Sequence, residues 1–293
     1  MSVFTDKWID EHKGELVEKL QQCVRINSVR DDGSTREGAP FGEGAAKCLE
    51  DTLNTAKEMG FEVKNLDGYC GTVDYGTGEE QLGILAHLDV VPEGEGWTYP
   101  PYAAEIHDGR LYGRGTMDDK GPAFAALFGL AAVKASGVET KRRVRLILGC
   151  DEECGMGCLH HYNEVEKAPD MCFSPDASYP LVNSEKMIYN SAYRKEYASA
   201  VRVKAGTVSN AVPGKAEVFV PVSADEVKAA VAKLNNADFT YNVSAADNGA
   251  NVVITGIAAH ASTPEQGKNA FLAAVQLMNE LNLPEEDADT VAV

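Results

Sequence analysis

Two apolar segments of this chain run directly into charged residues, and this feature constrains the fold most. Residues 82–86 are followed by His87 and Asp89, and residues 144–149 are followed by the acidic triplet 151–153. Short apolar runs bounded by turn residues are typical of buried strands. In open α/β sheets, ligands bind at the carboxyl ends of the strands. The sequence therefore predicts an α/β sheet with a polar site where its strands end.

Capped and amphipathic segments around these strands predict the helices of the same domain. Apolar residues recur at spacings of three and four in residues 5–26, and a second helix is expected over residues 42–59. A third helix is expected over residues 119–136, with Gly137 just after its end. Between the strands, Asp108-Gly109 predicts a β-hairpin.

The pattern of predicted elements changes near residue 187. Ser223 and Glu226 form a capping-box pattern at the start of a helix, and a second helix is expected over residues 265–281. Strands are expected over residues 198–204, 216–222, 240–245 and 251–257. This ββαββα order is α+β, so we predict a first domain over residues 1–187 and a smaller second domain over residues 188–293.

Composition narrows the possible partners and the compartment. The 293 residues include 45 acidic and 27 basic ones, a net charge of −18, which disfavours binding to nucleic acid or to an anionic membrane surface. Seven scattered cysteines do not resemble a disulfide framework, which favours the cytoplasm. The sequence contains neither a recognisable signal peptide nor an apolar run long enough to cross a membrane. It leaves the oligomeric state open.

The first candidate motif is the pair His87 and Asp89. Residues two apart in an extended chain face the same side, so the two side chains can act together. Asp89 can accept a hydrogen bond from one ring nitrogen of His87 while the other nitrogen binds a metal. A salt bridge at the end of the strand, with no metal, is the alternative.

Four further acids follow predicted strands or precede a helix. Asp118 lies in GRGTMDDKG at the start of the third helix, where exposed N–H groups favour carboxylates and an acidic N-cap is the alternative. A phosphate loop is disfavoured because GxxxxGK[ST] is absent and two aspartates would repel a phosphate. Glu152 and Glu153 follow a strand, where a solvated acidic turn is the alternative, and Asp176 follows a short apolar stretch.

Taken together, these motifs favour a metal site over unrelated acids at strand ends. A site that gathers several carboxylates and one histidine requires compensating positive charge. Two divalent cations would supply this charge, and zinc accepts both oxygen and imidazole ligands.

Five segments together resemble metallopeptidase family 20, and within it the peptidase V-like dipeptidases of the Xaa-His or carnosinase type. They are AHLDVVPEGEGW, DGRLYGRGTMDDKGP, DEECGMGC, EKAPDMCFSPDASYPLVNSEK and GIAAHASTPEQGKNA. The resemblance implies a di-zinc aminopeptidase-like catalytic domain with a central mixed sheet flanked by helices. It also implies an α+β ferredoxin-like lid domain and hydrolysis of small dipeptides, such as Xaa-His with a free N-terminus.

The same resemblance implies the metal ligands. His87 and Asp176 would each bind one of two zinc ions, Glu153 would also bind one, and Asp118 would bridge both. Family members often have a cis peptide bond after the bridging acid. The ligand types do not distinguish zinc from manganese or cobalt, because selectivity follows geometry and metal availability as well.

The remaining site residues are also implied by the resemblance. Glu152 corresponds to the general base, and Asp89 to the carboxylate that supports the histidine ligand. In the second domain, His260 corresponds to a lid histidine that donates to the tetrahedral intermediate. Asn210 corresponds to a lid residue that, with His260, helps to hold the substrate.

One departure from the family affects the expected activity. The family has a further zinc-binding histidine near the end of its catalytic domain, and the only candidate substitutes in this sequence are His160 and His161. We expect the chain to end inside an incomplete lid, to expose an apolar sheet edge and to be nearly inactive. This departure makes an inactive fragment one alternative. Because the family's machinery is shared, an N-acyl amino acid deacylase of the acetylornithine deacetylase or succinyl-diaminopimelate desuccinylase type is the other.

Overall fold

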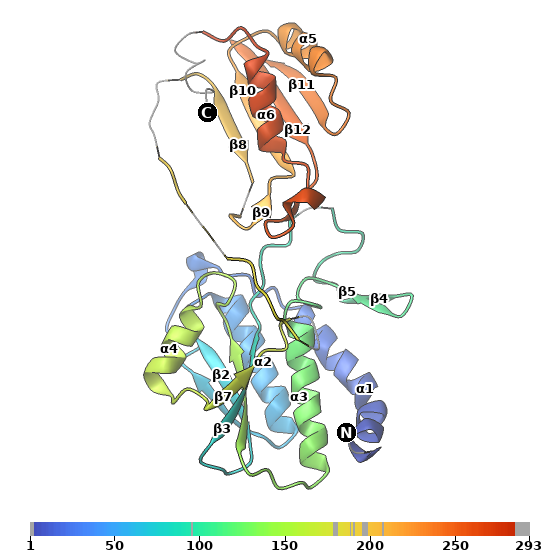
Figure 1. Cartoon of the computed structure of the whole chain (residues 1–293), viewed down its shortest axis with the longest axis vertical. Helices are drawn as coiled ribbons and strands as arrows, with labels where there is room; N and C mark the ends of the chain where they lie inside the picture. Colours follow the sequence, from blue (N-terminus) through green and yellow to red (C-terminus); the bar gives the residue numbers. More distant parts are fainter. Residues whose placement is uncertain are drawn as a thin grey trace. The chain divides into compact units, whose positions relative to one another are not determined.

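The chain forms two compact units, residues 1–183 and residues 184–293 (Figure 1). The computed structural model describes residues 3–94, 96–177, 181–187, 189, 191–194, 199–206 and 208–284. The assignment of residues 1–187 to a catalytic domain and of residues 188–293 to a lid stays a prediction.

A five-stranded mixed sheet forms the centre of the first unit. Its order is β1-β2-β6-β3-β7, with antiparallel pairing among β1, β2 and β6 and parallel pairing of β3 with β6 and β7. The strands are β1 (Glu62–Leu66), β2 (Cys70–Tyr75), β3 (Gln81–His87), β6 (Arg143–Gly149) and β7 (Met171–Phe173). The apolar runs that predicted buried strands become β3 and β6, so the expected α/β class with a central mixed sheet is confirmed.

Helices cover this sheet and complete its apolar core. Helix α2 packs against β1 and β2, α3 packs against β3 and β6, and α1 packs on α3 (Figure 1). The helices are α1 (Val3–Val24), α2 (Glu43–Glu58), α3 (Lys120–Ala135) and α4 (Gly157–Val165), with a short 3-10 turn η1 (Asp32–Ser34). Leu49, Phe124, Leu127 and Leu146 are among the fully buried core residues. The expected hairpin forms from β4 (Glu105–His107) and β5 (Arg110–Tyr112).

Strand β7 lies at one edge of the five-stranded sheet and is exposed along its length. Met171 and Phe173 are 53% and 46% exposed. This edge pairs on one side only, with β3, and presents apolar side chains to solvent among the described residues. Such an edge is a site for pairing with another chain or segment.

A four-stranded antiparallel sheet with two helices forms the second unit. Its order is β11-β12-β10-β8, and α5 and α6 pack against it around a separate apolar core. The strands are β8 (Arg202–Ala205), β10 (Lys215–Val220), β11 (Thr240–Ala246) and β12 (Gly249–Thr255). The helices are α5 (Ala224–Leu234) and α6 (Ala270–Asn279), with a 3-10 turn η2 (Pro264–Gln266). This unit has the expected α+β composition.

Two expected elements of the second unit differ in extent. The helix expected over residues 265–281 begins at Ala270, because the side chain of Asn269 accepts hydrogen bonds from Phe271 N and Leu272 N and caps the helix there. The strand expected over residues 198–204 begins at Arg202, and Ala198 lies outside the described residues. A two-stranded ribbon of β9 (Ala211–Val212) and β13 (Ala259–His260) also forms, which the sequence pattern does not predict.

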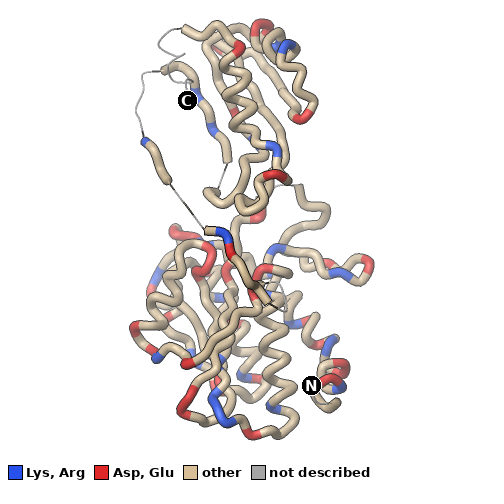
Figure 2. The backbone as a smooth tube through the Cα atoms, in the orientation of Figure 1, with Lys and Arg blue, Asp and Glu red and all other residues tan. Residues whose placement is uncertain are grey.

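Charges of both signs occur along both units. Figure 2 shows Asp and Glu interspersed with Lys and Arg, in a chain with 45 acidic and 27 basic residues. No helix among the described residues is long and apolar enough to cross a membrane.

Candidate metal centre

His87 lies at the centre of a group of acidic side chains. It is the last residue of β3, where the parallel register with β6 places it opposite Gly149, and it is only 2% exposed. Its Nε2 atom lies 3.0 Å from Asp118 Oδ1, 3.5 Å from Asp176 Oδ2 and 3.8 Å from Glu152 Oε2. The end of one strand therefore brings His87 together with acids that lie up to 89 positions further along the chain.

The donor atoms form two overlapping sets around this imidazole. His87, Asp118 and Asp176 make one set, and His87, Glu152 and Glu153 make the other. Within each set, one donor atom from every residue lies within 4.8 Å of the others. All four residues expected to bind metal are thus present, together with the expected base. His87 belongs to both sets, and the bridging role of Asp118 stays a prediction.

Asp89 connects His87 to the acidic turn after β6. His87 Nδ1 donates to the main-chain oxygen of Asp89 at 2.9 Å and lies 3.4 Å from its carboxylate. The Asp89 carboxylate in turn accepts hydrogen bonds from Glu152 N and Glu153 N, both at 3.1 Å. This one buried residue therefore orients the imidazole and positions both glutamates.

Asp119 is a structural part of the site that the sequence pattern did not single out. It is fully buried, and its Oδ2 accepts a hydrogen bond from His87 N at 3.0 Å. The peptide bond between Asp118 and Asp119 is cis, as the family resemblance implied. The next residue, Lys120, is also buried and donates to the carbonyl oxygens of Cys23 and Ile26. Asp119 and Lys120 are charged residues at the start of an apolar helix, and this position could have indicated their structural role from the sequence.

The electrostatics of the cluster favour a bound cation. Burial opposes protonation of His87, but the neighbouring carboxylates of Asp118, Asp176 and Asp89 raise its pKa above the ordinary value. Burial raises the pKa of Glu153 to about 7, and Asp118 contributes to that increase. Burial likewise raises the pKa of Glu152, with Asp176 and other acids adding to the shift. Glu153 is thus able to hold a proton near neutral pH unless a positive charge replaces it.

The donor chemistry fits one or two divalent ions. Carboxylate oxygens and an imidazole nitrogen are the ligand types of zinc and also suit manganese and cobalt. Metal ligands bind in their deprotonated form, so a divalent ion would displace protons from the imidazole and the carboxylates. Its positive charge would then balance the carboxylates in place of those protons. The two overlapping sets around His87 suit a pair of adjacent ions.

The second unit brings together the other two predicted site residues. In the ribbon of β9 and β13, His260 lies opposite Ala211, and Ala261 N donates to the main-chain oxygen of Asn210 at 2.7 Å. The imidazole of His260 is exposed, and its Nδ1 lies 2.7 Å from Ser262 Oγ. His260 and Asn210 are therefore neighbours, and their roles toward a substrate stay predictions.

His160 and His161 do not join either donor set among the described residues. Both lie in α4, and the ring of His161 stacks on Tyr69 with its Nε2 3.2 Å from Asp67 Oδ2. The structure therefore gives His161 a different environment from the acidic cluster.

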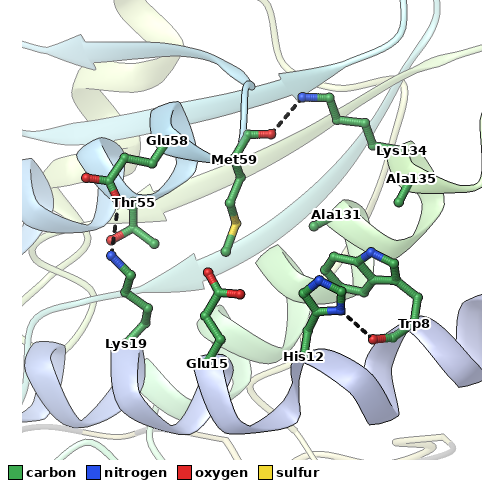
Figure 3. Close-up of a pocket in the computed structure, with 10 residues that line it drawn as sticks. All are labelled: Trp8, His12, Glu15, Lys19, Thr55, Glu58, Met59, Ala131, Lys134 and Ala135. Carbon is green, nitrogen blue, oxygen red and sulfur yellow. Dashed lines mark hydrogen bonds and ion pairs between the residues drawn. The ribbon is translucent and has the colours of Figure 1, made fainter.

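A separate cavity of about 440 Å³ lies between α1, α2 and α3 (Figure 3). Trp8 and His12 stack in its wall at 3.8 Å between ring centroids, and Lys19 pairs with Glu58 at 3.0 Å. None of the predicted catalytic or metal-binding residues lines this cavity.

The chain resembles known proteins in sequence over most of its length. Residues 83–278 match the peptidase family M20/M25/M40. YtjP of Bacillus subtilis, a putative dipeptidase by name, is 36% identical over 92% of this chain and 61% of its own length. The Beta-Ala-Xaa dipeptidase of Lactobacillus delbrueckii subsp. lactis is 36% identical over 89% of this chain and 58% of its own length. The chain thus spans about three fifths of the length of these relatives.

One solved structure is similar to about half of the chain. The crystal structure of human carnosine dipeptidase 1 is 26% identical, covers 55% of this chain and 37% of its own, and gives a TM-score of 0.47.

Proposed function

The chain belongs to the peptidase family M20/M25/M40, and we propose that it carries the metal centre of a dipeptidase. The observation that carries this proposal is the pair of donor sets that share His87. The proposed substrates are small dipeptides with a free N-terminus, of the Xaa-His type or similar. β-Alanyl-histidine is the substrate to test first, because one relative is named for β-alanyl dipeptides. The cysteines are free thiols, which agrees with a proposed cytoplasmic location.

The proposed metal ligands are His87, Asp118, Glu153 and Asp176. They would hold two divalent ions, zinc in the first instance, with Asp118 between them. Such ions, when bound, make water a nucleophile near neutral pH and polarise the scissile carbonyl.

Glu152 is the proposed general base. Its carboxylate faces His87 Nε2 at 3.8 Å, so it lies beside the proposed ligands. Burial raises its pKa above the ordinary value, which brings a carboxylate closer to the operating pH of a proton acceptor. Glu152 accepts the proton of the attacking water and passes it to the leaving amine. Asp89 supports this step because it holds the main-chain N–H of Glu152.

The proposed lid residues are His260 and Asn210. If residues 1–187 act as the catalytic domain and residues 188–293 as a lid, closure would let His260 donate to the oxyanion that forms on the substrate. Asn210 would help to hold the substrate from the same ribbon.

The test measures metal binding and hydrolysis separately. The purified chain, supplied with Zn²⁺ or Mn²⁺, is expected to retain close to two ions, measured by elemental analysis after desalting. It is assayed with β-alanyl-histidine and with N-acetylated amino acids, beside the Lactobacillus relative as a positive control. Faster turnover of the N-acetylated compounds than of β-alanyl-histidine would show that the activity is that of a deacylase and not of a dipeptidase. A chain that retains no metal would contradict the proposed function.

A further inference from the structure

An ion pair outside the donor sets ties the N-terminal segment to the acidic turn. Arg30 follows α1, and its Nη1 donates to Asp151 Oδ1 at 3.0 Å across 121 positions of sequence. Asp151 is 2% exposed, although it adjoins the glutamates of the proposed metal centre. A buried carboxylate is costly unless a charge or several hydrogen bonds compensate it. Asp151 therefore depends on Arg30.

Asp151 closes the turn that carries both glutamates. Its main-chain oxygen accepts from Met156 N at 2.8 Å, and its Oδ2 accepts from Gly157 N at 3.1 Å. Asp151 at the start of the turn is thus hydrogen-bonded to both residues at its end, and Glu152 and Glu153 lie between them. Because Asp89 holds the N–H groups of these glutamates, their carboxylates are placed by two acids, one on each side of the turn.

The guanidinium of Arg30 is itself held in place. Its Nε donates to Asp32 Oδ1 at 2.9 Å, and its Cζ lies over the Phe41 ring at 5.6 Å from the centroid. The packing around the turn is close: a Cβ atom at Gly157 would lie 2.8 Å from Asp151 Oδ2 and 3.3 Å from the Phe41 ring. A fork-shaped guanidinium that pairs with two carboxylates is not equivalent to a lysine.

We infer that Arg30 is a positioning residue of the metal centre, which acts through Asp151 on the placement of Glu152 and Glu153. This inference rests on the proposed function, because it assumes that these glutamates serve a bound metal. Arg30 touches none of the proposed ligands among its described contacts, so its effect passes through the turn. Outer partners of metal ligands commonly change metal affinity by about 10–100-fold.

The experiment titrates the purified chain with Co²⁺ and follows the visible absorbance of the bound ion. Arg30→Gln and Asp151→Asn are each expected to lower Co²⁺ affinity by about 10-fold. The double variant should lose no more than the stronger single variant, because both changes break the same connection. Arg30→Lys is expected to restore part of the affinity. Urea unfolding without metal measures the stability of each variant in parallel.

Arg142→Gln is the matched control. Arg142 pairs with Glu80 at 2.8 Å in the same unit, and both side chains are exposed. This variant should bind Co²⁺ like the wild type.

The outcomes separate the inference from the proposed function. Wild-type affinity in Arg30→Gln, whatever its stability, would overturn the positioning role and leave the metal centre intact. The inference would also be overturned if the fold-loss of Co²⁺ affinity in the double variant equalled the product of the losses in the two single variants. If Arg30→Gln does not fold, Asp151→Asn decides, and wild-type Co²⁺ affinity in that variant contradicts the inference. Absence of Co²⁺ binding by the wild type would overturn both proposals.

Discussion

His87 Nδ1 lies 2.9 Å from the main-chain oxygen of Asp89. A carbonyl oxygen only accepts hydrogen bonds, so Nδ1 carries the proton and donates it. The opposite nitrogen, Nε2, points to the acidic cluster and lies 3.0 Å from Asp118 Oδ1. The backbone near Asp89 therefore fixes which nitrogen of His87 would bind a metal.

His87→Ala is expected to remove metal binding. The imidazole belongs to both donor sets, so its loss takes a ligand from each. Elemental analysis after metal loading and desalting should show at least one ion fewer per chain than in the wild type. His161→Ala is the control, since His161 lies beside Asp67 and Tyr69 and should retain wild-type metal content. Equal metal content in His87→Ala and the wild type would contradict the ligand assignment.

Glu152→Gln and Glu153→Gln are expected to separate catalysis from metal binding. Glu152→Gln should keep the metal and lower kcat by about 10²–10⁴-fold, because general base catalysis contributes that much. Glu153→Gln should lower metal content, since it removes a proposed ligand. Both are measured in a version of the chain extended by a full-length relative's C-terminal segment, once that version hydrolyses a dipeptide. Glu164→Gln, an exposed residue of α4, serves as the control. The reverse pattern would show that the two glutamates exchange roles.

Much of the framework of the first unit could be predicted from local patterns. The apolar runs identified β3 and β6, and Asp108 and Gly109 adopt φ angles of 51° and 73°, as their hairpin requires. In the second unit, Ser223 Oγ accepts from Glu226 N at 3.2 Å, as the capping pattern predicted. These features depend on a few neighbouring residues, so sequence alone indicates them.

The contacts that organise the site could not be predicted in the same way. The hydrogen bonds from Glu152 and Glu153 to Asp89 depend on the parallel register of β3 and β6, which no local pattern encodes. The ribbon beside His260 has strands of two residues, too short for any periodicity. The ion pair of Arg30 with Asp151 spans 121 positions, so the residues around Arg30 in the sequence do not indicate its partner.

The first unit is expected to lose stability in acid partly through Glu166. Its carboxylate accepts from Lys64 Nζ and Arg145 Nη1, each at 2.7 Å, and these bonds lower its pKa. A lowered pKa stabilises the fold above the unfolded value of about 4.3, and the contribution disappears as the pH falls through the folded value. Glu166→Gln should therefore lower the free energy of unfolding by about 1–3 kcal/mol at pH 7.

The measurement is urea unfolding followed by tryptophan fluorescence at pH 7 and near pH 3. Trp8 and Trp97 both lie in the first unit, so the fluorescence reports on that unit. The difference between wild type and Glu166→Gln should shrink at the lower pH. A difference that is equal at both pH values would show that the charge of Glu166 contributes nothing.

Phe173→Glu is expected to reduce self-association of the chain. Phe173 and Met171 lie exposed on β7, the strand at one edge of the five-stranded sheet, and an exposed apolar edge favours pairing with another strand. A charge on the edge disfavours such pairing. Light scattering over a range of protein concentrations should show a lower average mass for Phe173→Glu than for the wild type. Val138→Glu, an exposed apolar residue outside the sheet, adds the same charge as a control. An equal decrease in both variants would assign the effect to net charge and not to the edge of β7.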